Sequence, residues 1–548
     1  MIRIETVGSK KVLTLDGRPF PLLAGEVHNS DSSSPAYMEH IWEIAGRLGM
    51  NALLLPVAWE TVEPMEGTFD FSLPQALILQ ARERNMRIVF LWFGSWKNAE
   101  CMYAPGWVKQ DLKRFPRAQI EKGKNKAGRA VSPGFPVRIP YTTLSYLGLE
   151  TARCDARAFA AFMRFLKAFD GQEQTVVAVQ VENETGLLGA AREVSDAADI
   201  AFESPVPPAF AAYMKSHTET MVDDVRAAVE QGAGSGTWRE VFGPAAEEIF
   251  SAYHVAGYVE TVASAGKAVY DLPLAVNCWL DKGGAPGTYP TGGPVSRVHE
   301  VWDVCAPSIS VYCPDIYVPQ FKAVCDEYTR RGNALFIPES ATHSYCAPRL
   351  LYTIGHYHAA CYSPFGFDDI GKPFTAVQGF LFGMDVSDPA LKTPQNQEEY
   401  QAVGQLLLNM LPLISEAYGT DRLQALSAET DSVSPGQGSN PLLSRQPCMD
   451  FEGFRLTVSF QGPTNPRADG ACLCLAVSST ECYVLGNACG LSFESLVHDQ
   501  PNLDFLQVEE GVFDNGKWIP GRRLNGDETA HLQLDRPGAL HVTFFSYA

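Results

Sequence analysis

The sequence lacks any long uncharged apolar run, and no basic segment followed by an apolar segment opens it. We therefore expect neither a membrane span nor a secretory signal, and we predict a cytoplasmic protein with no membrane partner. Basic residues are also scarce, since 43 Lys and Arg stand against 63 Asp and Glu, which gives a net charge of −20. Such a charge disfavours nucleic acid as a partner and favours a neutral ligand.

The sequence also lacks the spacings of familiar metal and nucleotide sites. Its 13 cysteines include no CxxC pair, and no cluster of His and Asp has the spacing of a divalent metal site. The glycine-rich stretch 283–293 matches neither the P-loop nor the dinucleotide pattern. We expect mostly buried free thiols in a reducing compartment, and neither a cofactor nor a metal.

What the sequence does contain is a regular alternation of strand-like and helix-like segments. With 548 residues, 46% of them hydrophobic, the chain can bury a large core. The expected strands cover residues 18–27, 51–57, 87–93, 176–184, 273–279, 308–317, 334–339 and 358–365. Polar and aromatic residues follow each strand, which is typical of parallel βα units that bind ligands at the carboxyl ends of their strands. The sequence predicts an α/β fold, a (β/α)8 TIM barrel.

The pattern changes near residue 420. We predict that the catalytic barrel covers residues 1–420, with an N-terminal hairpin and a mostly helical insertion near residues 190–270. Residues 431–446 resemble a linker, and later segments alternate between apolar and polar residues, as strands do. Residues 421–548 are therefore predicted to form a C-terminal β-sandwich-like domain.

Two expected strands end in a carboxylate. The stretch VVAVQVENE ends in Glu184, and ALFIPE ends in Glu339. In an eight-stranded barrel, strands four and seven lie across the mouth from each other, so these carboxylates can face one another. One carboxyl group can then protonate a glycosidic oxygen while the other attacks the anomeric carbon, and retention of configuration requires a separation of about 5–5.5 Å.

Other residues near the strand ends are candidates for the same site. Strand alternation places Glu182 on the same face as Glu184, so spacing leaves open which of the two is the acid. Tyr317 is expected to hydrogen-bond Glu339, because strand six neighbours strand seven. The further candidates for substrate contact are Trp59, Trp96, Trp279, Asn277 and His343. Each of these also has a simpler explanation as a packing residue or a satisfied polar group.

The motifs together resemble those of clan A glycoside hydrolases, and most closely family 35, the β-galactosidase family, in a shorter bacterial type. They are VQVENE, NALLLPVAWE with EPMEGTFDF, FIPES and YSPFGFDDI, and residues 508–529 resemble the β-domain of such enzymes. The resemblance implies that Glu184 is the acid/base and Glu339 the nucleophile. It further implies that Asn183 binds the sugar 2-hydroxyl and that Glu100, at the end of GSWKNAE, contacts sugar hydroxyls.

The function implied by this resemblance is that of a retaining exo-β-galactosidase. Its substrate would be terminal β-galactose on an oligosaccharide, and a homo-oligomer is compatible with it. The sequence departs from the family where strand one ends in GEVH and where strand three lacks Gly-Pro-Tyr. Another clan A exo-glycosidase, acting on β-glucosides, α-arabinosides or β-fucosides, therefore remains open, as does a carbohydrate-binding protein without catalysis.

Overall fold

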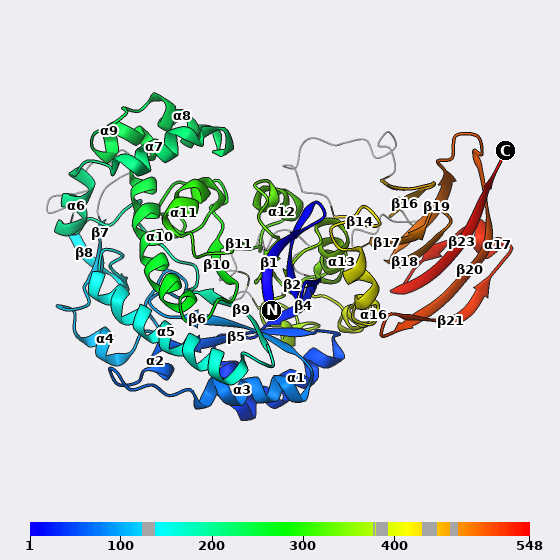
Figure 1. The fold of residues 1–548 in the computed structure, drawn as a ribbon, viewed down its shortest axis with the longest axis horizontal. Helices are drawn as coiled ribbons and strands as arrows, with labels where there is room; N and C mark the ends of the chain where they lie inside the picture. Colours follow the sequence, from blue (N-terminus) through cyan, green and yellow to red (C-terminus); the bar gives the residue numbers. More distant parts are fainter. Residues whose placement is uncertain (123–136, 376–378, 380–392, 430–446, 461–469) are drawn as a thin grey trace.

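The computed structural model describes residues 1–122, 137–375, 379, 393–429, 447–460 and 470–548. Eight parallel strands form one sheet in the spatial order β11-β10-β9-β6-β5-β4-β13-β12. Figure 1 shows this barrel with its helices in blue to green, and antiparallel strands in orange and red at the far end of the molecule. The prediction of a (β/α)8 barrel followed by a C-terminal β region is confirmed.

The barrel strands are almost wholly buried, because side chains fill the barrel and helices cover it. They are β4 (Leu22–Glu26), β5 (Ala52–Ala58), β6 (Arg87–Phe93), β9 (Val176–Val181), β10 (Leu274–Trp279), β11 (Val311–Asp315), β12 (Phe336–Ile337) and β13 (Cys361–Tyr362). The last two are shorter than predicted over residues 334–339 and 358–365. Pro338 and Pro364 follow them closely, and proline has no N–H to donate to a ladder.

The N-terminal segment forms a separate small sheet. The strands β1 (Ile2–Val7) and β2 (Lys10–Leu15) pair as an antiparallel hairpin, and β3 (Arg18–Pro19) adds a third strand. The single strand predicted over residues 18–27 is therefore two strands, β3 and β4. Prolines at positions 19 and 21 interrupt the hydrogen bonding between them.

The barrel closes between β11 and β12 without a continuous ladder. The Ile316 N–H donates to the Glu339 carbonyl at 2.9 Å, and Ile316 forms an isolated parallel bridge with Ser340. This seam lies at the carboxyl ends of the strands, beside the predicted nucleophile. The sheet is therefore a nearly closed barrel whose seam adjoins the expected site.

Helices cover the outside of the barrel. Those that follow or precede barrel strands are α1 (Pro35–Arg47), α2 (Trp59–Val62), α3 (Ser72–Glu83), α4 (Gly106–Gln110), α5 (Leu149–Asp170), α10 (Ala246–Lys267), α11 (His299–Cys305), α12 (Phe321–Thr329), α13 (Cys346–Tyr352) and α16 (Gln397–Ala417). The segment between β9 and β10 also carries α6 (Asp196–Glu203), α7 (Pro208–Ser216), α8 (Asp223–Gln231) and α9 (Trp238–Phe242). Local chemistry sets the helix starts: Ser34 caps α1 by accepting the Tyr37 N–H, and Pro35 opens the helix. No helix among the described residues is long and apolar enough to cross a bilayer.

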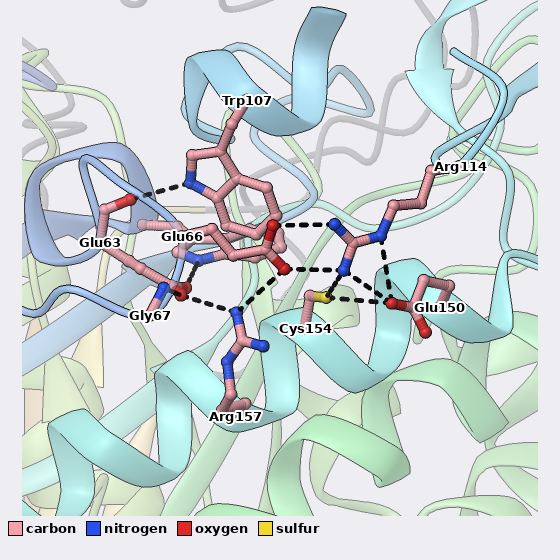
Figure 2. Close-up of polar contacts among 9 residues, drawn as sticks. Glu63, Glu66, Gly67, Trp107, Arg114, Glu150, Cys154 and Arg157 are labelled. Atoms are coloured by element: carbon pink, nitrogen blue, oxygen red, sulfur yellow. Dashed lines mark hydrogen bonds and ion pairs between the residues drawn. The ribbon is translucent and has the colours of Figure 1, made fainter. Parts of the chain in front are cut away.

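A buried carboxylate fixes the loop of residues 63–67, which follows α2 (Figure 2). Glu63 accepts hydrogen bonds from Trp59 Nε1 at 2.8 Å and from the Gly67 N–H at 2.6 Å. It also pairs with Arg157 of α5 at 2.7 Å. Figure 2 also shows more exposed ion pairs of Arg114 with Glu66 and Glu150, and the Trp107 indole N–H donating to the Glu63 carbonyl.

The C-terminal region consists of two antiparallel sheets. One has the order β14-β17-β18-β23-β20-β21, and the other β15-β16-β19-β22. Their strands are β14 (Leu423–Ser427), β15 (Cys448–Phe451), β16 (Phe454–Ser459), β17 (Ala471–Ser478), β18 (Glu481–Asn487), β19 (Cys489–Ser495), β20 (Asn502–Asp514), β21 (Lys517–Leu524), β22 (Gln533–Leu534) and β23 (Gly538–Tyr547). The predicted linker over residues 431–446 lies outside the described residues, and the domain boundary at residue 420 stays a prediction.

Strand β17 shows how this region joins the barrel. Cys472 and Cys474 face the core between the two sheets, whereas Leu473 and Leu475 belong to the core of the barrel. Alternation along one strand therefore serves two cores. None of the 13 cysteines, all of which lie among the described residues, forms a disulfide bond.

Candidate active site

Three carboxyl groups meet where the barrel strands end. Glu184 lies just beyond β9, Asp315 ends β11 and Glu339 lies just beyond β12. Carboxylate oxygens of the three residues lie within 4.8 Å of one another, and the residues are 7%, 3% and 5% exposed. The structure thus brings together the two carboxylates that the sequence singled out and adds a third between them.

These groups line a small cavity of about 160 Å³. Its walls are formed by Asn29, Lys97, Asn98, Glu184, Trp279, Lys282, Asp315, Tyr317, Glu339 and Phe365. The cavity is smaller than the ~300–1,000 Å³ of most small-molecule sites, so it suits one small ring rather than a length of polymer. A larger hollow of about 800 Å³ lies between the N-terminal hairpin and α16, away from these carboxyl groups.

Glu339 is held by donors from three neighbouring strand ends. Tyr317 donates its hydroxyl to Oε2 of Glu339 at 2.8 Å, which is the hydrogen bond that strand order predicted. The amide nitrogens of Asn183 and Asn277 each lie 3.4 Å from Oε1. Hydrogen bonds of this kind stabilise the ionised form of a carboxyl group, which is the form a nucleophile needs.

Glu184 is in a different electrostatic environment. Burial, followed by the charge of Glu339, raises the pKa of Glu184 to about 7, although the Lys97 ammonium acts in the opposite direction. Its backbone N–H donates to Oδ1 of Asn277 at 3.0 Å, which fixes the start of its side chain. A carboxyl group that is protonated near neutral pH and faces a cavity suits a general acid.

Lys97 supplies positive charge to this group of acids. It is 3% exposed, and its ammonium donates to Oδ1 of Asn183 at 3.0 Å. Burial alone would lower the pKa of Lys97, but the charges of Glu339 and Glu184 outweigh burial, so that the pKa is raised. Lys97 therefore keeps its positive charge, which offsets part of the negative charge of the neighbouring carboxylates.

Glu26 lies at the end of β4 and is fully buried. Neither of its carboxyl oxygens has a hydrogen-bond partner among the described residues. Burial first, and then the charge of Glu339, raise the pKa of Glu26 well above its usual value. Its position therefore favours the protonated form of the carboxyl group.

Glu182 points away from the cavity. Its φ of +62° turns the chain out of strand geometry, so alternation fails between positions 182 and 184. Its Oε2 accepts the Trp96 N–H at 2.8 Å, and burial together with the carboxyl of Asp155 raises the pKa of Glu182 well above its usual value. A Cβ at Gly94 would lie 2.7 Å from Glu182 Oε1 and 2.8 Å from Asp155 Oδ1, so only glycine allows this approach.

Six of the predicted contact residues do not line the cavity that the described residues form: Asn183, Asn277, Trp59, Trp96, His343 and Glu100. The indole N–H groups of Trp59 and Trp96 are used by Glu63 and by the Gly186 carbonyl. His343 contacts Arg349, with 3.2 Å between Nε2 and Nη1, and Glu100 is joined to Lys97 through its backbone. Their partners are distant in sequence or come from the backbone, so no pattern in the sequence predicts these positions.

Sequence reasoning overlooked three charged residues of the cavity, namely Lys97, Lys282 and Asp315. Asp315 ends the strand-like run SISVYCPD, in the same way that Glu339 ends its own run. Lys97 follows the wholly apolar run of β6 by four residues. The rule that singled out Glu339, a charged group at the end of a buried strand, would also have found Asp315.

The described residues include two groups of side chains with the spacing of metal ligands. They are Glu184 with Asp315 and Glu339, and His28 with Asp368 and Asp369. The ammonium of Lys97 already compensates the first group, and Lys372 pairs with the second at 2.7 Å. Protein cations thus occupy the role that a metal ion would have.

Two family models match parts of the chain. Residues 12–119 match Glycosyl hydrolases family 35, and residues 401–534 match Domain of unknown function (DUF5597). The first match covers β4, β5 and β6 with the helices between them. It confirms the predicted resemblance to family 35 and supports a glycoside hydrolase. No curated protein matches the chain.

Solved structures of several glycosidases resemble the fold. A β-galactosidase from the psychrophilic Marinomonas ef1 is 14% identical, with 72% of this chain covering 60% of that one and a TM-score of 0.44. A catalytic mutant of a GH42 β-galactosidase from G. stearothermophilus is 12% identical, with coverages of 73% and 59% and a TM-score of 0.45. An exo-beta-1,4-mannosidase from Opitutaceae bacterium strain TAV5 is 14% identical, with coverages of 76% and 63% and a TM-score of 0.42. The chain thus spans about three fifths of their lengths.

Proposed function

Starting from a barrel whose first part matches glycosyl hydrolases family 35, we propose that the protein is a retaining exo-β-galactosidase. The observation that carries the proposal is the approach of Glu184 and Glu339, whose carboxylate oxygens lie within 4.8 Å of each other. Retaining glycosidases hold their two carboxyl groups about 5–5.5 Å apart, whereas inverting enzymes need about 6.5–9.5 Å to admit a water molecule. The pair therefore fits double displacement.

In the first half of the reaction, the Glu339 carboxylate attacks the anomeric carbon while the Glu184 carboxylic acid protonates the departing oxygen. The bond to the leaving group breaks as the bond to Glu339 forms. Forming that ester removes the negative charge of Glu339, which is one of the causes that raise the pKa of Glu184. The pKa of Glu184 then falls, so that Glu184 can accept a proton from the water that releases the sugar.

The substrate we propose is a terminal β-galactoside on an oligosaccharide. A cavity of about 160 Å³ is compatible with one terminal ring, and Trp279 offers a face for stacking. The family resemblance implies that Asn183, whose amide nitrogen lies 3.4 Å from Glu339, binds the 2-hydroxyl, and we include that role in the proposal. A cytoplasmic setting is consistent with the absence of disulfide bonds among the 13 cysteines, all of which the structure describes.

The substrate is tested with a panel of nitrophenyl β-galactoside, β-glucoside, β-fucoside and α-arabinoside. We expect the highest kcat/KM for the galactoside, and proton NMR should detect the β-anomer of the product first. Preference for another glycoside would show that galactose is not the sugar of the natural substrate. First release of the α-anomer would exclude a retaining mechanism. Turnover of none of them by a folded protein, with sugar binding intact, would instead leave a carbohydrate-binding protein.

The roles of the two carboxyl groups are tested by substitution. Glu339→Ala should abolish hydrolysis, and azide should rescue it as the inverted glycosyl azide. Glu184→Ala should lose about 10²–10⁴-fold in kcat/KM and, with azide, give the azide of retained configuration. In the wild type, kcat/KM should fall as pH rises above about 7, because Glu184 must carry its proton in the first step. Unchanged activity of Glu339→Ala would remove it from the mechanism.

A further inference from the structure

We propose that Asp315 is a neutral carboxylic acid that donates a hydrogen bond to Glu184 and so holds the acid/base in position. Asp315 is a positioning residue in this proposal, because it acts on the reaction through Glu184. The inference rests on the proposed glycosidase function for its kinetic consequences. Its structural content, a proton on Asp315, does not depend on that function.

The geometry around Asp315 supports a proton shared between two carboxyl groups. Asp315 Oδ2 accepts the Asn277 amide at 2.8 Å, whereas no amide or hydroxyl donor among the described residues reaches Oδ1. Carboxylate oxygens of Asp315 and Glu184 lie within 4.8 Å of each other, and a hydrogen bond from Asp315 to Glu184 lowers the pKa of Glu184. Two carboxyl groups can form such a bond only when one of them carries a proton.

The side chains near Asp315 include more carboxyl groups than cations. The titratable groups that face it are the carboxyls of Glu26, Glu184 and Glu339, the ammonium of Lys97, the thiols of Cys278 and Cys313, and the Tyr317 hydroxyl. Lys282, on the cavity wall, adds a second cation near Glu184. Four carboxyl groups thus share two cations, so some of the four must stay neutral.

Asp315 is better placed to stay neutral than Glu339. Burial, and then the charges of Glu339 and Glu184, raise the pKa of Asp315 well above its usual value. Glu339 instead accepts the Tyr317 hydroxyl at 2.8 Å, a bond that favours its ionised form. The proton therefore belongs to Asp315, as in other sites where crowded carboxyl groups divide into acid and anion.

The same contacts explain how Asp315 could serve catalysis. Asn277 accepts the backbone N–H of Glu184 and donates to Asp315, so one amide fixes both the Glu184 backbone and the Asp315 carboxyl group. When Glu184 gives its proton to the leaving group, the O–H of Asp315 stays intact and donates to the new carboxylate. That bond stabilises the ionised acid/base and thereby lowers the pKa of Glu184.

The test compares Asp315→Ala with Asp315→Asn through the pH dependence of kcat/KM. Alanine removes the donor, so the pKa of Glu184 should rise, and the alkaline limb should move up by about one pH unit. The asparagine amide can still donate to Glu184, so the limb should stay near that of the wild type. Cys313→Ala, also buried on β11, is the matched control and should leave the limb in place.

Two outcomes would overturn the proposal. If Asp315 is an anion, both substitutions remove a negative charge beside Glu184. The alkaline limb of the pH profile would then move to lower pH in both variants. If neither limb moves while thermal unfolding shows both variants to be folded, Asp315 and Glu184 are not coupled.

Infrared difference spectroscopy provides a measurement that does not require activity. The wild type at neutral pH should show the carbonyl stretch of a protonated carboxyl group that is missing from Asp315→Asn. Absence of this band with normal turnover would sink the role of Asp315 and leave the glycosidase proposal intact. Presence of the band in a protein that hydrolyses no glycoside would support the proton on Asp315 and overturn the glycosidase proposal.

Discussion

Glu182 is two residues away from Glu184 in sequence, but its carboxyl group faces Asp155 and the Trp96 N–H. Glutamine in its place can donate to Asp155 and still accept from Trp96. We predict that Glu182→Gln changes the free energy of unfolding by less than about 1 kcal/mol and keeps kcat/KM within severalfold. Glu182→Ala leaves the buried Trp96 N–H without its acceptor and should cost about 1–3 kcal/mol in urea unfolding.

The kinetic comparison also decides between the two glutamates. Glu184→Gln should lose most of its activity, because the amide cannot protonate the leaving group. If Glu182→Gln lost as much activity as Glu184→Gln while remaining folded, Glu182 would be the acid.

The residues that the sequence predicted well are those whose position follows from burial alone. A strand buried on both faces can carry a carboxylate only at its end, which is why Glu184 and Glu339 could be singled out. The choice between Glu182 and Glu184 could not be made, since alternation assumes strand geometry and Glu182 has a φ of +62°. Trp96 was expected at the sugar, but its indole N–H donates to the Gly186 carbonyl, a tertiary contact without a signal in the sequence.

At the scale of elements, the loop of residues 63–67 contrasts a buried carboxylate with an exposed one (Figure 2). Glu63 is fully buried and serves the N–H groups of Trp59 and Gly67. We predict that Glu63→Ala lowers the free energy of unfolding by about 2–4 kcal/mol, because two N–H groups lose their acceptor. This change in the free energy of unfolding is measured by urea titration with tryptophan fluorescence as the probe.

Glu66→Ala is the matched control for this loop. Its ion pairs with Arg114 are exposed to water, so its removal should leave the urea midpoint almost unchanged. Equal losses in the two variants would mean that ion pairing, rather than burial of Glu63, stabilises the loop.

Element types were predicted more reliably than element lengths. Apolar runs identified the barrel strands, but β12 and β13 contain two paired residues each, because the prolines at 338 and 364 limit the ladder. The seam between β11 and β12 could not be predicted, since a single hydrogen bond from Ile316 to the Glu339 carbonyl leaves no periodic pattern. Closure of the barrel is a property of tertiary structure.

At the scale of the whole molecule, one buried ion pair joins the barrel to the C-terminal region. Arg349 of α13 binds Glu429, just after β14, at 2.6 Å, and both side chains are buried. We predict that Arg349→Met lowers the free energy of unfolding by about 3–5 kcal/mol, because it leaves the Glu429 carboxylate buried without a partner. Urea unfolding measured by circular dichroism checks this value.

The double variant Arg349→Met/Glu429→Leu separates loss of a charge from loss of an interaction. Removing both charges should recover most of the stability lost in Arg349→Met, since two apolar side chains need no partner. A double variant less stable than Arg349→Met would show that the pair itself holds the two regions together.

The tripeptide Asp315-Ile316-Tyr317 also has an evolutionary consequence. Its first residue lies within 4.8 Å of Glu184, the proposed acid/base, its second closes the barrel through a backbone N–H, and its third donates to Glu339, the proposed nucleophile. Insertion or deletion of one residue here would displace all three functions at once. Descendants of this chain can therefore vary the tripeptide by side-chain replacement, whereas a change in its length would require the catalytic centre to be rebuilt.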